Sequence, residues 1–299
     1  MLRSYLLLIF CVTVWGSNFV FGNILAKQFS PLFLAMARLL FISLFLLGYT
    51  RVRHRFVSVR KQEWKLLILL GIIGVFINQW SFYQGLQTAD PTTSALILAL
   101  TPITTALLAA LFLKEALTVT MLAGSLVAIT GVFLVVFNGA RLEFHIGHLW
   151  IFVTMITFAI SIVLVRLLAR RLPPIITTLY STLVGFGTMV PVVLAGGTGW
   201  SISHEAWAWV LLIVTAILMH GIVTLIWNSQ LQKVGAAKAA MFSNLEPFVA
   251  MIVGYVILGQ LVTSQQLFGS LFIVGGVTLA SLTGKFPSKW LQRGPRREY

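Results

Sequence analysis

The sequence is a succession of apolar stretches, each about 20 residues long and separated from the next by a short polar joint. A helix of about 20 apolar residues crosses the hydrocarbon core of a bilayer, which is roughly 30 Å thick. Only 9% of the residues are charged, against about 25% in soluble domains. Water cannot be the main solvent for such a surface. The chain is therefore predicted to be an all-α integral membrane protein.

The apolar stretches predict ten transmembrane helices, and the joints between them contain proline, glycine and charge. The first stretch is longer than the apolar core of a secretory signal and is interpreted as a retained helix. No joint is long enough to be a separate soluble domain. The predicted helices cover residues 4–26, 31–50, 64–86, 92–113, 119–137, 148–168, 175–195, 206–228, 237–258 and 264–283.

The basic residues of these joints fall almost entirely on one side of the predicted membrane. Of the 21 lysines and arginines, only Lys27 and Arg141 lie on the outer side if the N-terminus is cytoplasmic, and Arg38 lies inside a helix. Cytoplasmic loops carry such an excess. We therefore expect a multi-pass protein of the plasma membrane with both termini in the cytoplasm. The net charge of +14 then faces lipid headgroups, and no nucleic-acid partner is expected.

The chain also matches itself when it is shifted by 145 residues, a shift that aligns Trp64 with Trp209 and Pro102 with Pro247. Each repeat would hold five helices, so the second repeat starts on the opposite side of the membrane and is inverted. Inverted repeats are frequent in secondary transporters. The predicted units are residues 1–138, residues 148–283 and a basic cytoplasmic tail, residues 284–299.

Several short motifs follow one another in a characteristic order. They are Trp15-Gly16-Ser17-Asn18, Ala37-Arg38-Leu39-Leu40, the run from Ala95 to Pro102, Phe112-Leu113-Lys114-Glu115-Ala116-Leu117-Thr118, and Asn244-Leu245-Glu246-Pro247-Phe248-Val249-Ala250. With these motifs the chain resembles the EamA-type ten-helix members of the drug/metabolite transporter superfamily. The resemblance implies export or exchange of small metabolites, often amino acids or related compounds, without ATP. One departure is Gln260, where the family has an acid that the first repeat keeps as Glu115.

Glu246 is the sharpest candidate for a functional residue, because an acid near the middle of a membrane helix is costly. It lies nine residues into the predicted helix 237–258 and is followed by Pro247. A proline bends a helix and frees a carbonyl group. This combination suits binding of a cation, an amine or a proton, and the alternative is a structural hydrogen bond. Pro102 and Pro247 are predicted to mark equivalent helix bends.

Two further ionisable residues lie within predicted helices. Arg38 is expected to snorkel toward the outer face, to neutralise Glu246, or to bind a substrate carboxylate. His220 is either a proton relay or a neutral, hydrogen-bonded group.

Amide and aromatic residues are concentrated in the helix predicted over 64–86. So many amides do not suit a face in contact with lipid, so they are expected to line a wet cavity, with an interfacial aromatic belt as the alternative. The predicted substrate site comprises Trp15, Asn18, Arg38, Asn78, Gln79, Trp80, Tyr83, Gln84, His220, Ser243, Asn244 and Glu246.

Small residues form stripes on two other predicted helices: Gly124, Ala128 and Gly131, and then Gly269, Gly276 and Ala280. Such stripes let helix backbones approach closely in lipid. Packing within one chain is the first interpretation and dimerisation the second, so both a monomer and a homodimer remain open.

The sequence thus favours a secondary transporter that exports or exchanges a small metabolite by alternating access. Coupling to protons is an open alternative, and so is a flippase for lipids or lipid-linked substrates. An intramembrane enzyme is less favoured, because the sequence has neither a P-loop nor a zinc-type His-Glu-x-x-His motif. The expected partners are a small-molecule substrate and the bilayer, without a cofactor or a metal.

Overall fold

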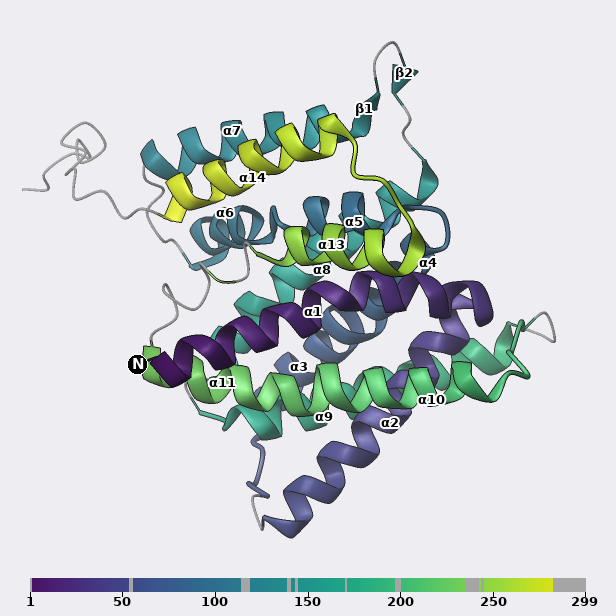
Figure 1. Ribbon diagram of the computed structural model, residues 1–299. Coiled ribbons are helices and arrows are strands. Elements are labelled where there is room, and N and C mark those ends of the chain that lie inside the picture. Colours follow the sequence, from purple (N-terminus) through teal and green to yellow (C-terminus); the bar gives the residue numbers. More distant parts are fainter. Residues whose placement is uncertain are drawn as a thin grey trace, which may run out of the picture.

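The computed structural model describes residues 2–53, 56–113, 119–138, 141–142, 145–169, 171–196, 200–234, 242 and 245–281. The described residues are almost entirely helical, and the helices pack side by side into one bundle (Figure 1). The exception is a short hairpin in which β1 (Phe137–Asn138) pairs with β2 (Arg141–Leu142). The all-α prediction is therefore confirmed.

Residues 2–136 form the helices of the first half. Three of the segments, α3, the π-helical η1 and α4, follow one another without a break. The helices are α1 (Leu2–Gln28), α2 (Pro31–Val52), α3 (Lys61–Leu69), η1 (Leu70–Ile77), α4 (Asn78–Leu86), α5 (Pro91–Leu98), α6 (Thr101–Leu113) and α7 (Val119–Val136).

Residues 146–281 form the second half, in which α10, the π-helical η2 and α11 are also continuous. The helices are α8 (Ile146–Leu168), α9 (Pro174–Ala195), α10 (Ala206–Thr215), η2 (Ala216–Ile222), α11 (Val223–Val234), α13 (Glu246–Leu258) and α14 (Ser264–Ser281).

The bundle has the dimensions and the surface of a membrane protein. Seven helical spans of the described residues are long and apolar enough to cross a bilayer, and three shorter apolar helices cover Val119–Val135, Glu246–Leu258 and Ser264–Ala280. Large apolar side chains such as Leu111, Leu126 and Leu271 are 64–72% exposed. An apolar surface on this scale would be an aggregation hazard in water but is the normal outside of a protein in lipid.

The packing of the helices repeats between the two halves. Helix α1 packs on α11 and α13 of the second half, and its counterpart α8 packs on α4 and α6 of the first half. In the same way α2 packs on η2, and α9 packs on η1. The first two helices of each half therefore contact the later helices of the other half.

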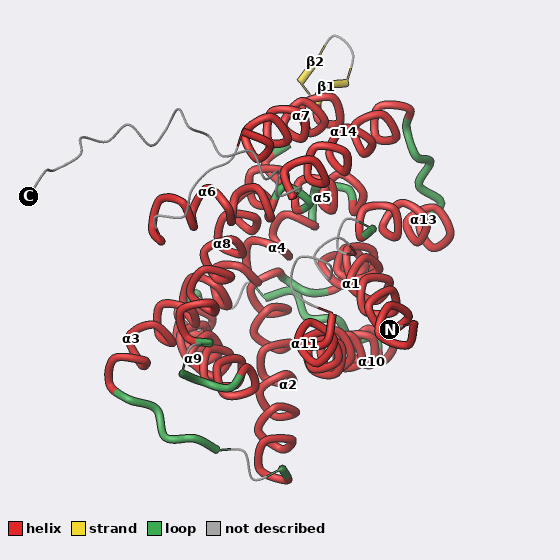
Figure 2. Tube along the Cα trace, turned by 90° about the vertical axis from the view of Figure 1, so that its left-hand side faces the viewer, coloured by secondary structure: helices red, strands yellow, loops and turns green. Residues whose placement is uncertain are grey.

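Helices α7 and α14 form a close pair (Figures 1 and 2). A Cβ atom placed on Gly124 would clash with the Gly276 carbonyl oxygen, and one placed on Gly131 would lie 2.7 Å from the Gly269 carbonyl oxygen. The two predicted small-residue stripes thus meet each other within one chain.

The predicted helix 92–113 is not continuous, because it is interrupted at Ala99 and Leu100 between α5 and α6. Pro102 lies in the first turn of α6, and Pro247 lies in the first turn of α13. A proline in the first turn loses no helical hydrogen bond, since that amide would be unpaired anyway. Each proline therefore begins a helix, where the sequence suggested a bend within one.

Candidate substrate site

Arg38 is the most deeply buried charged residue that the structure describes in the bundle. Its side chain is 0% exposed. Its Nη1 donates a hydrogen bond to Thr215 Oγ1 at 2.6 Å, and its Nη2 lies 3.3 Å from His220 Nδ1. Its guanidinium lies 5.4 Å from the centre of the Tyr83 ring. Arg38 therefore joins α2 and α4 of the first half to α10 and η2 of the second.

The charge of Arg38 has no counterion within the described part of the chain. No described carboxylate forms an ion pair with it, and its Nε has no hydrogen-bond partner. The hydroxyl of Tyr83, 0% exposed, is unpartnered as well. A buried charge without a counterion is unstable relative to a paired one. The guanidinium Nε and the phenol hydroxyl are therefore two free donors, from which a carboxylate could accept hydrogen bonds.

The structure also bears on the other roles considered for Arg38. The guanidinium is enclosed and does not reach the outer surface, so the side chain does not snorkel. Arg38 and Glu246 are both described, and no ion pair joins them. His220 accepts the contact from Arg38, because a guanidinium has only donors.

We call Arg38 and its three contacts, Tyr83, Thr215 and His220, the Arg38 cluster. Helix α1 passes between this cluster and Glu246. The Nε1 of Trp15 donates to the Met219 carbonyl oxygen at 2.9 Å, next to His220 in η2. On the following residue, a Cβ atom added to Gly16 would lie 2.9 Å from the Glu246 carbonyl oxygen. The same turn of α1 therefore contacts the backbone of η2 beside His220 and the backbone of Glu246 at the start of α13.

Glu246 is the first residue of α13, so it lies at a helix start in the described chain. An acid at this position interacts favourably with the helix dipole. Within the described residues, the Glu246 carboxylate has no hydrogen-bond or ion-pair partner. The predicted site residues Ser243 and Asn244 lie outside the described part of the chain. The carboxylate remains available to a cation, an amine or a proton.

The aromatic and amide residues predicted for the site fall into two groups. The first group packs helices together. Asn78 Nδ2 donates to the Thr154 carbonyl oxygen at 2.9 Å and to Thr157 Oγ1 at 3.1 Å, which ties α4 to α8. The Trp80 ring stacks on Phe76 and packs at a tilt against Trp150, with centroids 6.1 and 5.4 Å away. Hydrogen bonds of this kind between membrane helices stabilise their packing.

The second group has free polar atoms. The buried oxygens Asn18 Oδ1 and Gln79 Oε1 have no hydrogen-bond partner among the described residues. Buried acceptors are normally paired, so unpaired ones are candidates for contact with water or a ligand. Gln84 donates instead to the exposed Gln87 Oε1 at 3.2 Å. The Trp15 ring lies 4.9 Å from that of Trp227 and offers an apolar face.

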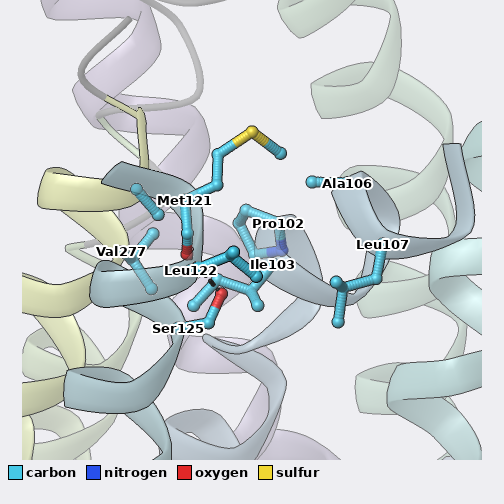
Figure 3. A pocket seen from close by; sticks show the side chains of 9 residues that line it. Pro102, Ile103, Ala106, Leu107, Met121, Leu122, Ser125 and Val277 are labelled. Atoms are coloured by element: carbon cyan, nitrogen blue, oxygen red, sulfur yellow. Dashed lines mark hydrogen bonds between the residues drawn. The ribbon is translucent and has the colours of Figure 1, made fainter. Parts of the chain in front are cut away.

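A separate cavity of about 160 Å³ lies between α6, α7 and α14 (Figure 3). Its walls are mostly aliphatic, and the Ser125 hydroxyl donates to the Met121 carbonyl oxygen within its own helix. The cavity includes none of the predicted substrate-site residues, but it does include the predicted bend residue Pro102 and Ala280 of the second small-residue stripe. It is lined by Pro102, Ile103, Ala106, Leu107, Met121, Leu122, Ser125, Val277 and Ala280.

Thr215 is the site residue that the sequence analysis missed. In an α-helix, residues five apart point about 140° away from each other, so Thr215 and His220 would not share a face. The π-helical segment η2 changes this spacing, because its hydrogen bonds join residues five apart. Both side chains can then contact Arg38. The residue types alone gave no signal for this shared face, because they do not distinguish a π-helical segment from an α-helix.

The chain is similar to known proteins over nearly its whole length. Residues 2–137 and 145–282 match the EamA-like transporter family. The "Uncharacterized transporter YyaM" of Bacillus subtilis is 29% identical, over 96% of each chain. The "Probable terminal-alkyne amino-acid exporter" of Streptantibioticus cattleyicolor is 24% identical, over 91% of each chain. A solved structure titled "Crystal structure of protein" shares the fold, with a TM-score of 0.69, 17% identity and coverage of 94% of this chain and 98% of that one.

Proposed function

Because the chain belongs to the EamA-like transporter family, we propose that it is a secondary transporter for a small metabolite that bears a carboxylate. The substrate class is an amino acid or a related amphipathic compound, exported or exchanged by alternating access. The observation that carries the proposal is the buried guanidinium of Arg38, which has no acidic partner among the described residues.

A substrate carboxylate supplies what the Arg38 cluster lacks. The planar guanidinium matches a carboxylate in shape, and charge-assisted hydrogen bonds of this type are stronger than neutral ones. The free donors, Arg38 Nε and the Tyr83 hydroxyl, are both buried, and the Tyr83 ring centre lies 5.4 Å from the guanidinium. The substrate neutralises the buried charge only while it is bound, which is what a carrier requires of its site.

Glu246 supplies a second binding group of opposite charge. In this proposal its free carboxylate receives the amine of the substrate or a coupled proton, and Trp15 of the intervening α1 turn contacts the apolar body. Proton coupling needs a Glu246 carboxyl group that gains and loses a proton, whereas amine binding needs its negative charge, and Glu246→Gln separates the two roles.

The proposed mechanism uses ten transmembrane helices arranged as two inverted five-helix repeats, residues 1–138 and 148–283, with a tail over residues 284–299. Three observations support this architecture: the exchange of packing between α1 and α8, the π-helical segments η1 and η2 at equivalent places, and the helix starts at Pro102 and Pro247. Two such repeats can exchange conformations, which gives inward-open and outward-open states. The excess of lysine and arginine in the joints on one side of the bundle supports a plasma-membrane protein with cytoplasmic termini.

A lipid flippase remains the rival function. A flippase needs a groove that opens sideways to lipid and accepts a polar headgroup. The cavity at Pro102 has a mostly aliphatic lining, and its serine hydroxyl is bonded within its own helix. This cavity therefore gives the flippase no support.

The proposed function is tested by comparing metabolites released from cells with and without the protein, followed by uptake of each released compound into liposomes that contain it. We expect the released compounds to share a carboxylate, and liposome uptake to need no ATP. Release of purely cationic compounds, or uptake that depends on ATP, would refute the proposal.

A further inference from the structure

A second cavity of about 390 Å³ lies at the end of the bundle that the charge bias assigns to the cytoplasm. One wall is the segment that leads into α3, and the other is the turn between α8 and α9, so each half of the chain supplies one wall. We name it the Arg60–Arg171 pocket. It is lined by Val57, Ser58, Arg60, Glu63, Arg171 and Leu172.

The Arg60–Arg171 pocket has an uncompensated positive charge. Both arginines are exposed, and neither forms an ion pair with a described residue. The acid in the lining, Glu63, is buried, and its Oε2 accepts a hydrogen bond from the Arg60 backbone amide at 2.8 Å. That carboxylate caps the start of α3. The two guanidinium groups are therefore left to bind an anion, and a phosphate fits them best.

The residues next to the pocket indicate its depth in the membrane. Arg60, Trp64 and Ile68 follow one another at four-residue spacing along α3, which is about 6 Å per step. The Trp64 ring packs on Tyr180 of α9 at 5.2 Å, and Ile68 one turn further is 45% exposed. Figure 2 shows α3 and α9 side by side at this edge of the bundle. Tryptophan and tyrosine gather where headgroups meet the hydrocarbon core.

The order from arginine to aromatic to aliphatic matches the order of a phospholipid from phosphate to glycerol to acyl chain. We propose that the Arg60–Arg171 pocket binds the phosphate of an anionic phospholipid from the cytoplasmic leaflet. The glycerol region lies against Trp64 and Tyr180, and the acyl chains follow α3. Because the arginines come from different halves, the lipid bridges the halves and stabilises the arrangement described above.

A soluble phosphate compound shares the headgroup chemistry, but it would not contact the aromatic rings of Trp64 and Tyr180 or the aliphatic surface of α3. The test uses the full-length protein in detergent with phosphatidylglycerol, phosphatidylcholine or inorganic phosphate, and native mass spectrometry measures bound lipid. The variant is Arg60→Gln/Arg171→Gln. The matched control is Arg3→Gln/Arg51→Gln, which removes two exposed charges from the same rim.

We expect the Arg60→Gln/Arg171→Gln variant to bind its tightest phosphatidylglycerol at least tenfold more weakly, and the control to stay within twofold of the wild type. Phosphatidylcholine binding should not change, and millimolar inorganic phosphate should not displace the lipid. Equal losses in both variants, an unchanged affinity in the first, or displacement by inorganic phosphate would each overturn the proposal. If the double variant does not fold, Arg171→Gln alone replaces it, with a loss of at least threefold expected and an unchanged affinity contradicting the site.

Discussion

Segment η1 packs against α9 through glycine and valine, whereas η2 packs against α2 through a buried arginine as well as through the close contact of Gly221 with Phe45. A Cβ atom added to Gly71 would lie 2.6 Å from Val184 Cβ, and one added to Gly185 would lie 2.6 Å from Val75 Cγ1. At the other interface Arg38 binds Thr215 and His220. The two π-helical segments are about 145 residues apart in the sequence, so in the proposed repeat they occupy equivalent places.

The same shift aligns Arg38 with Leu183, His220 with Val75, and Thr215 with Leu70. The interface between η1 and α9 therefore relies on aliphatic side chains and close backbone contact, where the interface between η2 and α2 has the arginine. Packing alone does not require an arginine at this interface, and a buried charge is often replaceable by apolar residues without loss of stability. In our proposal the difference arises because Arg38 serves binding, while the residue aligned with it serves packing.

The largest effect on transport is expected for Arg38→Leu, which replaces the arginine between α2 and η2 with the residue type that the repeat aligns with it in α9. Transport of the released compound should fall roughly 100-fold, because a buried charge pair is lost in the bound state. The yield and the apparent Tm should change little, since leucine suits a buried apolar contact between helices and is the residue that the shift of 145 residues aligns with Arg38. Liposome uptake measures the first quantity and thermal unfolding in detergent the second. Arg51→Leu, an exposed position on the same helix, is the matched control and should transport normally.

A substitution in the interface between η1 and α9 tests whether close packing holds these helices together. Gly185→Leu should destabilise the protein by about 2 kcal/mol and lower its Tm by roughly 5 °C, because the new side chain overlaps Val75 and the Gly71 carbonyl group. Gly187→Leu is the control, since an added Cβ atom there meets nothing within 4 Å. Equal Tm values for the two variants would mean that this glycine contact does not hold the halves together.

Glu246 extends the comparison, because its equivalent in the first half is Thr101, whose hydroxyl donates to the Leu98 carbonyl oxygen at 2.6 Å. Glu246→Gln keeps the shape and removes the charge. If the acid carries a proton, uptake driven by a pH gradient should fall roughly tenfold, while exchange at equal pH on both sides continues. Loss of both activities would indicate binding of the substrate amine, and loss of neither would remove Glu246 from the site.

The smallest effect is expected for Thr215→Val, which leaves one Arg38 donor without its hydroxyl partner. The apparent substrate affinity should weaken about fivefold, since an unpaired buried donor costs about 1 kcal/mol. The KM for liposome uptake measures this effect. Thr224→Val is the matched control, because the Thr224 hydroxyl donates to the Met219 carbonyl oxygen at 3.5 Å, within the continuous helix formed by α10, η2 and α11. Similar KM values for the two variants would place Thr215 outside the site.

The sequence was sufficient for the helices whose apolar length is set by the bilayer, such as α2, α8 and α9. It also selected Arg38, Tyr83 and His220 as candidates, because charge and polarity are rare in such helices, and the structure places the other two in contact with Arg38. It did not separate Asn78, which packs α4 on α8, from Gln79, which has a free buried oxygen. That distinction depends on neighbours from distant parts of the chain.

Other features had no signal at the level of residue type. A π-helical segment and an α-helix have the same composition, so the shared face of Thr215 and His220 was hidden. Nor does a proline indicate whether it bends a helix or begins one, as Pro102 shows. Both outcomes depend on which backbone groups the tertiary structure leaves unpaired.

The pairing of Arg38 with a substrate carboxylate is tested most directly by changing both partners in one experiment. Uptake of the transported amino acid and of its carboxamide is measured in liposomes with the wild-type protein and with Arg38→Leu. If the two groups bind each other, Arg38→Leu slows the amino acid roughly 100-fold but changes the carboxamide by less than about twofold. Equal slowing of both compounds would contradict a contact between Arg38 and the carboxylate.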